Sequence, residues 1–218
     1  MAERILLNCD CMDYMKDCED NAFDLAIVDP EYGNESDATK TYTSNSKNRV
    51  TERKIYKQFK NIQPKPEYFT ELMRISGKQI IWGVNFYKNV DLTGGRIVWD
   101  KIGTVFGRAE IAYYSHSRSV QIFQYEWNGM LQGNMKNKEY RIHPTQKPVK
   151  LYEWLLTNYA KEGDRILDTH LGSGSSAIAA HYGQFDFVGM EIDEDYYNAA
   201  CKRFDDETAQ LDLLAYNG

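Results

Sequence analysis

The chain has 218 residues, 42% of them hydrophobic, and a formal net charge of −6 at pH 7. Its longest apolar runs, such as residues 79–84, are too short to cross a bilayer, and residues 1–10 lack the basic and then apolar layout of a signal peptide. Length and composition therefore exclude a membrane-spanning protein and predict one domain of enzyme size in the cytoplasm.

The four cysteines indicate neither a disulfide framework nor a metal site. Cys9, Cys11, Cys18 and Cys201 lack the paired spacing of zinc ligands and have no histidines nearby. We therefore expect reduced thiols and no bound metal.

Short apolar runs alternate with helical patterns along the chain, which is typical of an α/β domain built on a largely parallel sheet. One helix begins at Pro148, a residue suited to the first helical position, and a second runs from residue 195 towards residue 209. Seven strands are predicted, at residues 5–7, 23–28, 79–84, 96–99, 111–114, 165–167 and 185–190.

Positive charge is concentrated in two stretches of this acidic chain. Residues 34–63 carry a net charge of +4, and residues 101–141 a net charge of +3. The first stretch is rich in Ser, Thr, Asn and Lys and is too long for an ordinary connection. Solvated loops would explain such runs, but clustered cations also suit phosphate binding, which needs positive charge on one face.

A glycine turn, residues 169–174, follows the predicted strand at residues 165–167 and leads into a helix start at residues 177–180. Gly172 and Gly174 let the backbone approach a ligand closely, and open α/β folds bind ligands at the carboxyl ends of their strands. The turn lacks the Lys-Ser or Lys-Thr of a phosphate loop and the spacing of the dinucleotide fingerprint. Glu191 ends the next strand, where a carboxylate can accept hydrogen bonds from both ribose hydroxyls.

A second candidate site, which we name the base loop, comprises Asp29, Pro30, Glu31 and Tyr32 directly after the apolar strand at residues 23–28. Taken alone, an Asp-Pro pair after a strand indicates a turn. A third element, residues 143–148, has the sequence His-Pro-Thr-Gln-Lys-Pro and brings polar side chains to the start of a helix.

The order of these three elements resembles the amino-methyltransferases of DNA, in the permuted arrangement in which the catalytic motif precedes the cofactor motif. That family typically has Asp-Pro-Pro-Tyr, a target-recognition insertion, His-Pro-Thr-Gln-Lys-Pro, and then Asp-Pro-Phe-X-Gly-Ser-Gly. The resemblance extends to Asp10 after the first strand and covers nearly the full chain. It implies a Rossmann-like methyltransferase fold over residues 1–218, with a seven-stranded mixed sheet, helices on both faces, and insertions at 34–63 and about 115–142.

The resemblance also implies a mechanism for methylating an exocyclic base amine, whose lone pair is delocalised into the ring. The Asp29 carboxylate and the Pro30 carbonyl would accept the two amine protons, while Tyr32 would stack on a base flipped out of the duplex. The cofactor would be S-adenosylmethionine, and no metal is needed. The residues expected around it are Asp10, Thr145, Gln146, Lys147, Asp168, Leu171, Gly172, Ser173, Gly174 and Glu191.

The chain departs from the family pattern in both motifs. Glu31 replaces the second proline of the catalytic motif, and Thr169 and His170 replace Pro-Phe before the glycines. His170 is a candidate cofactor contact or a local polar contact at the turn. The change to Glu31 adds a negative charge near the base, which is compatible with retuned activity or with a catalytically impaired relative.

An aspartate in first position resembles the adenine-N6 enzymes, so we expect site-specific methylation of adenine in double-stranded DNA. Cytosine N4 is the alternative, and an RNA adenine or a protein amide stays open. No cysteine follows a proline, which excludes the covalent carbon-5 cytosine mechanism. A prokaryotic or phage-encoded protein and a possible homodimer are also expected. The candidate DNA contacts are Lys47, Arg49, Arg53, Lys54, Arg118, Lys136 and Lys138.

Overall fold

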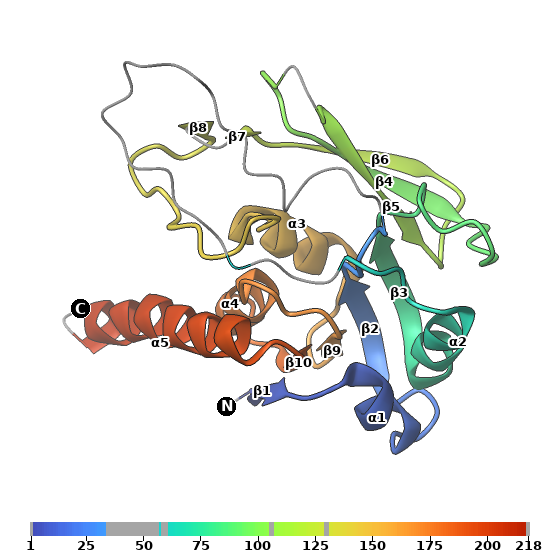
Figure 1. The fold of residues 1–218 in the computed structure, drawn as a ribbon. Helices are drawn as coiled ribbons and strands as arrows, with labels where there is room; N and C mark the ends of the chain where they lie inside the picture. Colours follow the sequence, from blue (N-terminus) through green and yellow to red (C-terminus); the bar gives the residue numbers. More distant parts are fainter. Residues whose placement is uncertain (1, 34–56, 58–60, 105–106, 129–130, 217–218) are drawn as a thin grey trace.

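A computed structural model describes residues 2–33, 57, 61–104, 107–128 and 131–216 (Figure 1). Its helices are α1 (Cys11–Lys16), α2 (Pro66–Ile75), α3 (Val149–Tyr159), α4 (Ser175–Tyr182) and α5 (Glu194–Tyr216). Its strands are β1 (Arg4–Asn8), β2 (Phe23–Val28), β3 (Ser76–Trp82), β4 (Gly95–Asp100), β5 (Ala109–Tyr114), β6 (Val120–Gln124), β7 (Trp127–Asn128), β8 (Leu131–Gln132), β9 (Arg165–Asp168) and β10 (Asp186–Glu191).

Eight of these strands form one mixed sheet in the order β1-β10-β9-β2-β3-β5-β4-β6, and β7 and β8 form a separate hairpin. Of the eight, β5 alone runs opposite to the others. All seven predicted strands are present, and the predicted mixed α/β fold is confirmed. The count of seven was wrong because β6, inside the predicted 115–142 insertion, is an edge strand that exposes most of its side chains.

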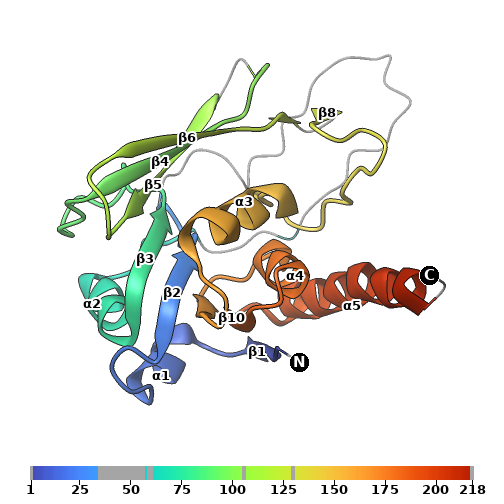
Figure 2. The ribbon, with the colours of Figure 1, turned by 180° about the vertical axis from the view of Figure 1, so that it is seen from behind.

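Helices cover both faces of the sheet, as expected (Figures 1 and 2). The alternation of side chains along β2 explains how one strand serves both faces: Leu25 and Ile27 pack on one side, and Ala26 and Val28 on the other. The first group joins the core beneath α3 and α4, and the second joins the core beneath α1 and α2. A strand buried on both faces is mostly apolar, and β2 is apolar at every position except the exposed Asp24, which made it easy to recognise in the sequence.

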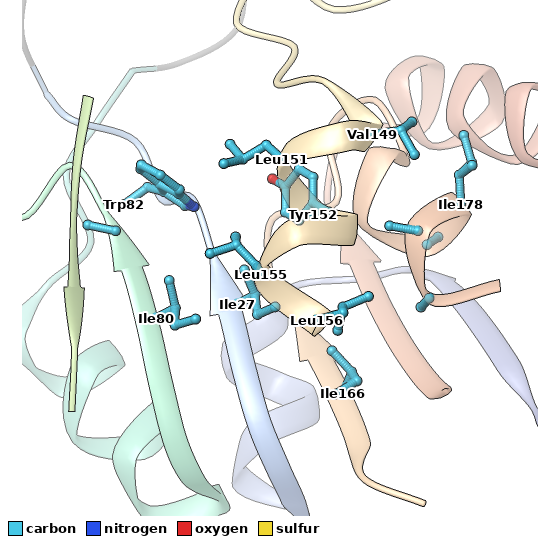
Figure 3. Close-up of a cluster of buried hydrophobic side chains, with 14 of the residues drawn as sticks. Ile27, Ile80, Trp82, Val149, Leu151, Tyr152, Leu155, Leu156, Ile166 and Ile178 are labelled. Atoms are coloured by element: carbon cyan, nitrogen blue, oxygen red, sulfur yellow. The ribbon is translucent and has the colours of Figure 1, made fainter. Parts of the chain in front are cut away.

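Helix α3 lies across the sheet and buries an apolar stripe that includes Leu151, with Leu155 and Leu156 beside Ile27 and Ile166 (Figure 3). The sequence placed Pro148 at the first helical position, but this residue is the N-cap, with extended backbone, and Val149 begins the helix. The element at residues 143–148 is thereby held at the start of a well-packed helix.

The sheet order decides where the site lies. Strand β9 pairs with β2, so the glycine turn and the base loop leave neighbouring strands at the same edge. From this boundary the chain proceeds in opposite directions, from β9 to β10 and from β2 to β3, with α4 and α2 on opposite faces. Such a topological switch point opens a crevice at the carboxyl ends of the strands, where α/β sheets bind ligands. Among the described residues, none of the helices is both long and apolar enough to span a membrane.

Candidate active site

A cavity of about 1220 Å³ lies at this edge of the sheet. It draws together the ends of β1, β2, β9 and β10 and the segment before α3. It also brings together most of the residues expected from the sequence. Those lining it are Asp10, Asp29, Pro30, Tyr32, Thr145, Gln146, Lys147, Leu171, Gly172, Ser173 and Glu191.

The base loop is held by hydrogen bonds on both of its proposed acceptors. The Asp29 carboxylate accepts a 2.7 Å hydrogen bond from the Tyr32 hydroxyl, and the Pro30 carbonyl accepts one of 2.9 Å from the Tyr87 hydroxyl. The Tyr32 ring stacks on Phe86 with centroids 4.7 Å apart and rings 12° from parallel. Stacking and hydrogen bonding within the protein therefore hold the loop in place.

Gly83, just past the end of β3, makes room for the Tyr32 ring. Its φ is +74°, and a Cβ atom built there would lie 2.1 Å from a ring carbon of Tyr32. A side chain would be unfavourable for both reasons, because the backbone is left-handed and the space is already filled. The position of Tyr32 thus depends on a glycine from a different strand.

Lys147 is directed at the base loop. Its ammonium pairs with the Asp29 carboxylate, lies 2.9 Å from Glu110 and lies 3.3 Å from the Tyr32 hydroxyl. Burial alone would lower the pKa of Lys147, but the charges of Asp29 and Glu110 outweigh it and raise that pKa. Lys101 pairs with the other oxygen of Glu110. Lys147, which was expected beside the cofactor, therefore forms a buried charge cluster at the proposed catalytic carboxylate.

The cofactor half of the site is built from the glycine turn and Glu191. The Gly172 amide donates a 2.9 Å hydrogen bond to Glu191, whose other oxygen accepts from the Asp193 amide at 2.9 Å. The Leu171 amide donates to the Met190 carbonyl at 2.7 Å. Burial raises the pKa of Glu191. These bonds bring the turn beside the carboxylate expected to bind a ribose.

Two of the expected cofactor residues are not among those lining the cavity. The Asp168 carboxylate is buried and accepts hydrogen bonds from the Ser176 hydroxyl at 2.5 Å and the His170 amide at 3.0 Å. Gly174, with φ +75°, is the N-cap of α4, and a Cβ there would lie 3.3 Å from the Ala200 carbonyl oxygen. Both residues therefore stabilise the glycine turn without lining the cavity.

Asp10, Thr145 and Gln146 line the cavity but also have structural partners. Asp10 is the N-cap of α1 and accepts a 2.8 Å hydrogen bond from the Met12 amide. The Gln146 side chain is buried and accepts a 2.9 Å bond from the Ile142 amide. Thr145 lies with its hydroxyl 3.0 Å from His143 Nδ1.

A family model for N6/N4-type DNA methylase matches residues 31–202, well over half of the chain. The chain belongs to the DNA methylase family. Two curated relatives support the assignment: the type II methyltransferase M.HpaI of Haemophilus parainfluenzae, 37% identical over 78 residues, and M2.DpnII of Streptococcus pneumoniae, 37% identical over 81 residues. The matches cover 36% and 37% of this chain but only 25% and 30% of the relatives' lengths.

Solved structures share the fold of this chain. The complex of M1.HpyAVI with SAM matches with a TM-score of 0.53 and 18% identity, covering 92% of this chain and 99% of that one. The PvuII DNA methyltransferase, described as cytosine-N4-specific, matches with a TM-score of 0.61 and 12% identity, covering 94% and 87%. A putative DNA modification methylase from Thermus thermophilus, complexed with S-adenosyl-L-methionine, matches with a TM-score of 0.52 and 15% identity. The match covers 94% of both chains.

The candidate DNA contacts predicted from the sequence are scattered along the chain. Lys47, Arg49, Arg53 and Lys54 lie outside the described residues. Arg118 is exposed in the turn between β5 and β6; because β5 runs antiparallel, this turn lies at the sheet edge opposite the cavity. Lys136 and Lys138 are exposed in the segment after β8. The structure therefore does not bring Arg118 to the site.

Several site residues were missed by sequence reasoning: Glu110, Lys101, Tyr87 and Gly83. Glu110 is the second residue of β5, a strand that was expected only from residue 111, and a lone acidic residue there carries no motif. Gly83 falls inside the predicted strand 79–84, where an interior glycine is a signal of a close backbone approach that could have been used. Among the described residues, no group of three or more His, Cys, Asp or Glu side chains could hold a metal ion.

Proposed function

We propose that this chain transfers a methyl group from S-adenosylmethionine to the exocyclic N6 amine of a flipped adenine in double-stranded DNA. The observation that carries the proposal is the opening of the base loop and the glycine turn onto one cavity, on neighbouring strands β2 and β9. Family membership and the methyltransferase activity named for the relatives support the reaction class.

The residues present fit the cofactor. Each Glu191 oxygen accepts one backbone amide and retains a lone pair, so the carboxylate can accept both hydroxyls of a ribose. Gly172 has φ +52°, which presents a turn without a side chain at the cavity wall. Asp10 would face the adenine, and Leu171 and Ser173 the amino acid moiety. S-adenosylmethionine would supply an activated methyl group on a sulfonium.

The base loop supplies the acceptors for the amine. Asp29 and Pro30 each have a hydrogen-bond donor within the protein, from Tyr32 and Tyr87, and each oxygen retains capacity for an amine N–H. Two acceptors held in this way favour a tetrahedral nitrogen, with its lone pair directed away from the ring, more in the transition state than in the ground state. The aromatic ring of Tyr32 would partly replace the stacking that the flipped base loses.

Cytosine N4 is the second candidate, favoured by the likeness to the cytosine-N4-specific PvuII enzyme. The aspartate in first position favours adenine. The test is nucleoside analysis of DNA methylated by the purified protein, in which N6-methyladenine is expected. N4-methylcytosine alone would overturn the choice of base.

A third alternative, a catalytically impaired relative that still binds cofactor or DNA, is tested by turnover of labelled S-adenosylmethionine. Wild-type protein should transfer label to DNA, and Asp29→Ala should not.

We also propose that Lys136, Lys138 and residues 34–63 contact the DNA backbone and that a homodimer enlarges this surface. Charge removal from residues 34–63 should then weaken DNA binding and reduce its salt dependence.

A further inference from the structure

The chain departs from the family motifs at three positions, and the residues there are in contact. They are Glu31, Thr169 and His170. His170 Nε2 lies 3.3 Å from a Glu31 carboxylate oxygen, and His170 Nδ1 lies 2.9 Å from the Thr169 hydroxyl. The Thr169 hydroxyl is in turn 2.6 Å from the Tyr68 hydroxyl of α2. Proline and phenylalanine at these positions would offer none of these polar atoms.

This contact spans the crevice between the two halves of the site. Backbone pairing between β2 and β9 covers only Leu25 with Ile166 and Ala26 with Leu167. Beyond it the strands lead into separate loops, one proposed to hold the base and the other the cofactor. Glu31 and His170 join these loops by their side chains where backbone pairing has ended. Methyl transfer is sensitive to the separation of such groups, because misplacement by about 1 Å can reduce a rate about 100-fold.

We infer that Glu31 and His170 form an ion pair that sets the spacing between the base loop and the glycine turn, which makes them positioning residues for methyl transfer. This inference rests on the proposed function. The side chains are mostly buried, 28% and 19% exposed, so removing one partner leaves a charge that water compensates poorly. The three departures from the family motifs therefore act together, because they replace an apolar contact between the two loops by a charged one.

The charged state of His170 is supported by its surroundings. Burial alone would lower the pKa of His170, but neighbouring carboxylates outweigh it and raise that pKa above 6.5. For Glu31 burial acts in the opposite direction, and the charge of His170 outweighs it and lowers the pKa. The groups facing this pair are Asp168 at the end of β9, Glu191 at the end of β10, Tyr68 on α2, Cys11 on α1 and His143 before α3.

A double-mutant cycle tests the inference, with methyl transfer to DNA measured for Glu31→Gln, His170→Gln and the double variant. Each single change should lower kcat about tenfold at saturating substrates, the scale of coupling between contacting charges, with smaller changes in KM. The double variant should lose no more than the worse single variant. Glu71→Gln, which breaks an ion pair with Arg74 on α2 away from the cavity, is the matched control and should leave kcat within about twofold.

A second variant keeps the test independent of folding. E31P/T169P/H170F restores the apolar family pattern and should regain wild-type kcat within about twofold. The pH profile adds a readout that a purely structural role would not move. Wild-type kcat should fall as pH rises through the raised pKa of His170. In Glu31→Gln this fall in kcat should occur at lower pH, and in the triple variant it should be absent.

Single-variant losses that multiply in the double variant would overturn the inference, as would a pH profile unchanged by Glu31→Gln. If wild-type protein transfers no methyl group, the proposed function fails instead. The same cycle is then run on the affinity for S-adenosylmethionine by calorimetry. Coupled effects there support the ion pair as a spacer, and additive effects overturn it.

Discussion

Replacing Lys147 with methionine would remove the cation that lies between Asp29 and Glu110 while keeping a side chain of similar length. Lys147 is only 4% exposed and contacts both carboxylates. The substitution leaves two partly buried anions facing an apolar side chain. We expect both stability and methyl transfer to fall, because the same cation neutralises the site and orients Asp29.

The magnitude follows from the burial of the three side chains. Breaking a buried ion pair by removing one partner typically costs about 3–5 kcal/mol. The side chains of Asp29 and Glu110 are 17% and 24% exposed, so water solvates them in part and the lower end applies. A loss of about 3 kcal/mol would lower the melting temperature by about 6–12 °C in a chain of this size. Misorientation of Asp29 should reduce kcat about 100-fold.

Urea denaturation followed by circular dichroism measures the stability, and transfer of labelled methyl groups measures kcat. Lys101→Met is the matched control, because Lys101 pairs with Glu110 without contacting Asp29 in the described structure. Lys101→Met should lower the stability and kcat less than Lys147→Met does. In Lys147→Met/Glu110→Gln, removal of the extra anion should recover part of the stability. A Lys147→Met variant with the urea midpoint and the kcat of wild type would refute the reasoning.

Three further predictions concern the geometry behind the base loop and the turn. Gly83→Ala should displace the Tyr32 ring, reduce kcat at least about tenfold and cost about 1–2 kcal/mol, because its Cβ would overlap that ring at a left-handed position. Tyr87→Phe should reduce kcat about fivefold, because the hydrogen bond to the Pro30 carbonyl contributes about 1 kcal/mol to its placement. Burial raises the pKa of Asp168 to about 6, from an ordinary value of 3.8. The folded state therefore binds the proton more readily, and wild type should gain about 2–3 kcal/mol relative to Asp168→Asn as pH falls from 7 to 4.

Steady-state kinetics check the first two predictions, and urea midpoints at several pH values check the third. Gly77→Ala is the control for Gly83→Ala, because a Cβ at Gly77 would meet its nearest atom at an ordinary 3.5 Å. Wild-type kcat in Gly83→Ala or Tyr87→Phe would contradict the proposed placement of the base loop. A pH-independent difference between wild type and Asp168→Asn would contradict the raised pKa.

The sequence by itself determined the elements whose signals are local. Strand β2 is apolar apart from the exposed Asp24 because both of its faces are buried, the glycines of the turn permit a left-handed backbone, and Pro148 restricts its own φ angle. The motif order then indicated the family, which the family model confirmed. The reduced cysteines stay a prediction, although the four thiols form no disulfide in the structure.

Only the tertiary structure decided which groups meet. Glu110 reaches Lys147 because β5 runs antiparallel and brings its first residues to the cavity edge, and the same reversal carries Arg118 to the opposite edge. Glu31 meets His170 because β9 lies beside β2, although 139 positions separate the two residues in the printed sequence. The physical reason is that strand neighbours are selected by packing and hydrogen bonding across the whole sheet, which no local pattern of residues encodes.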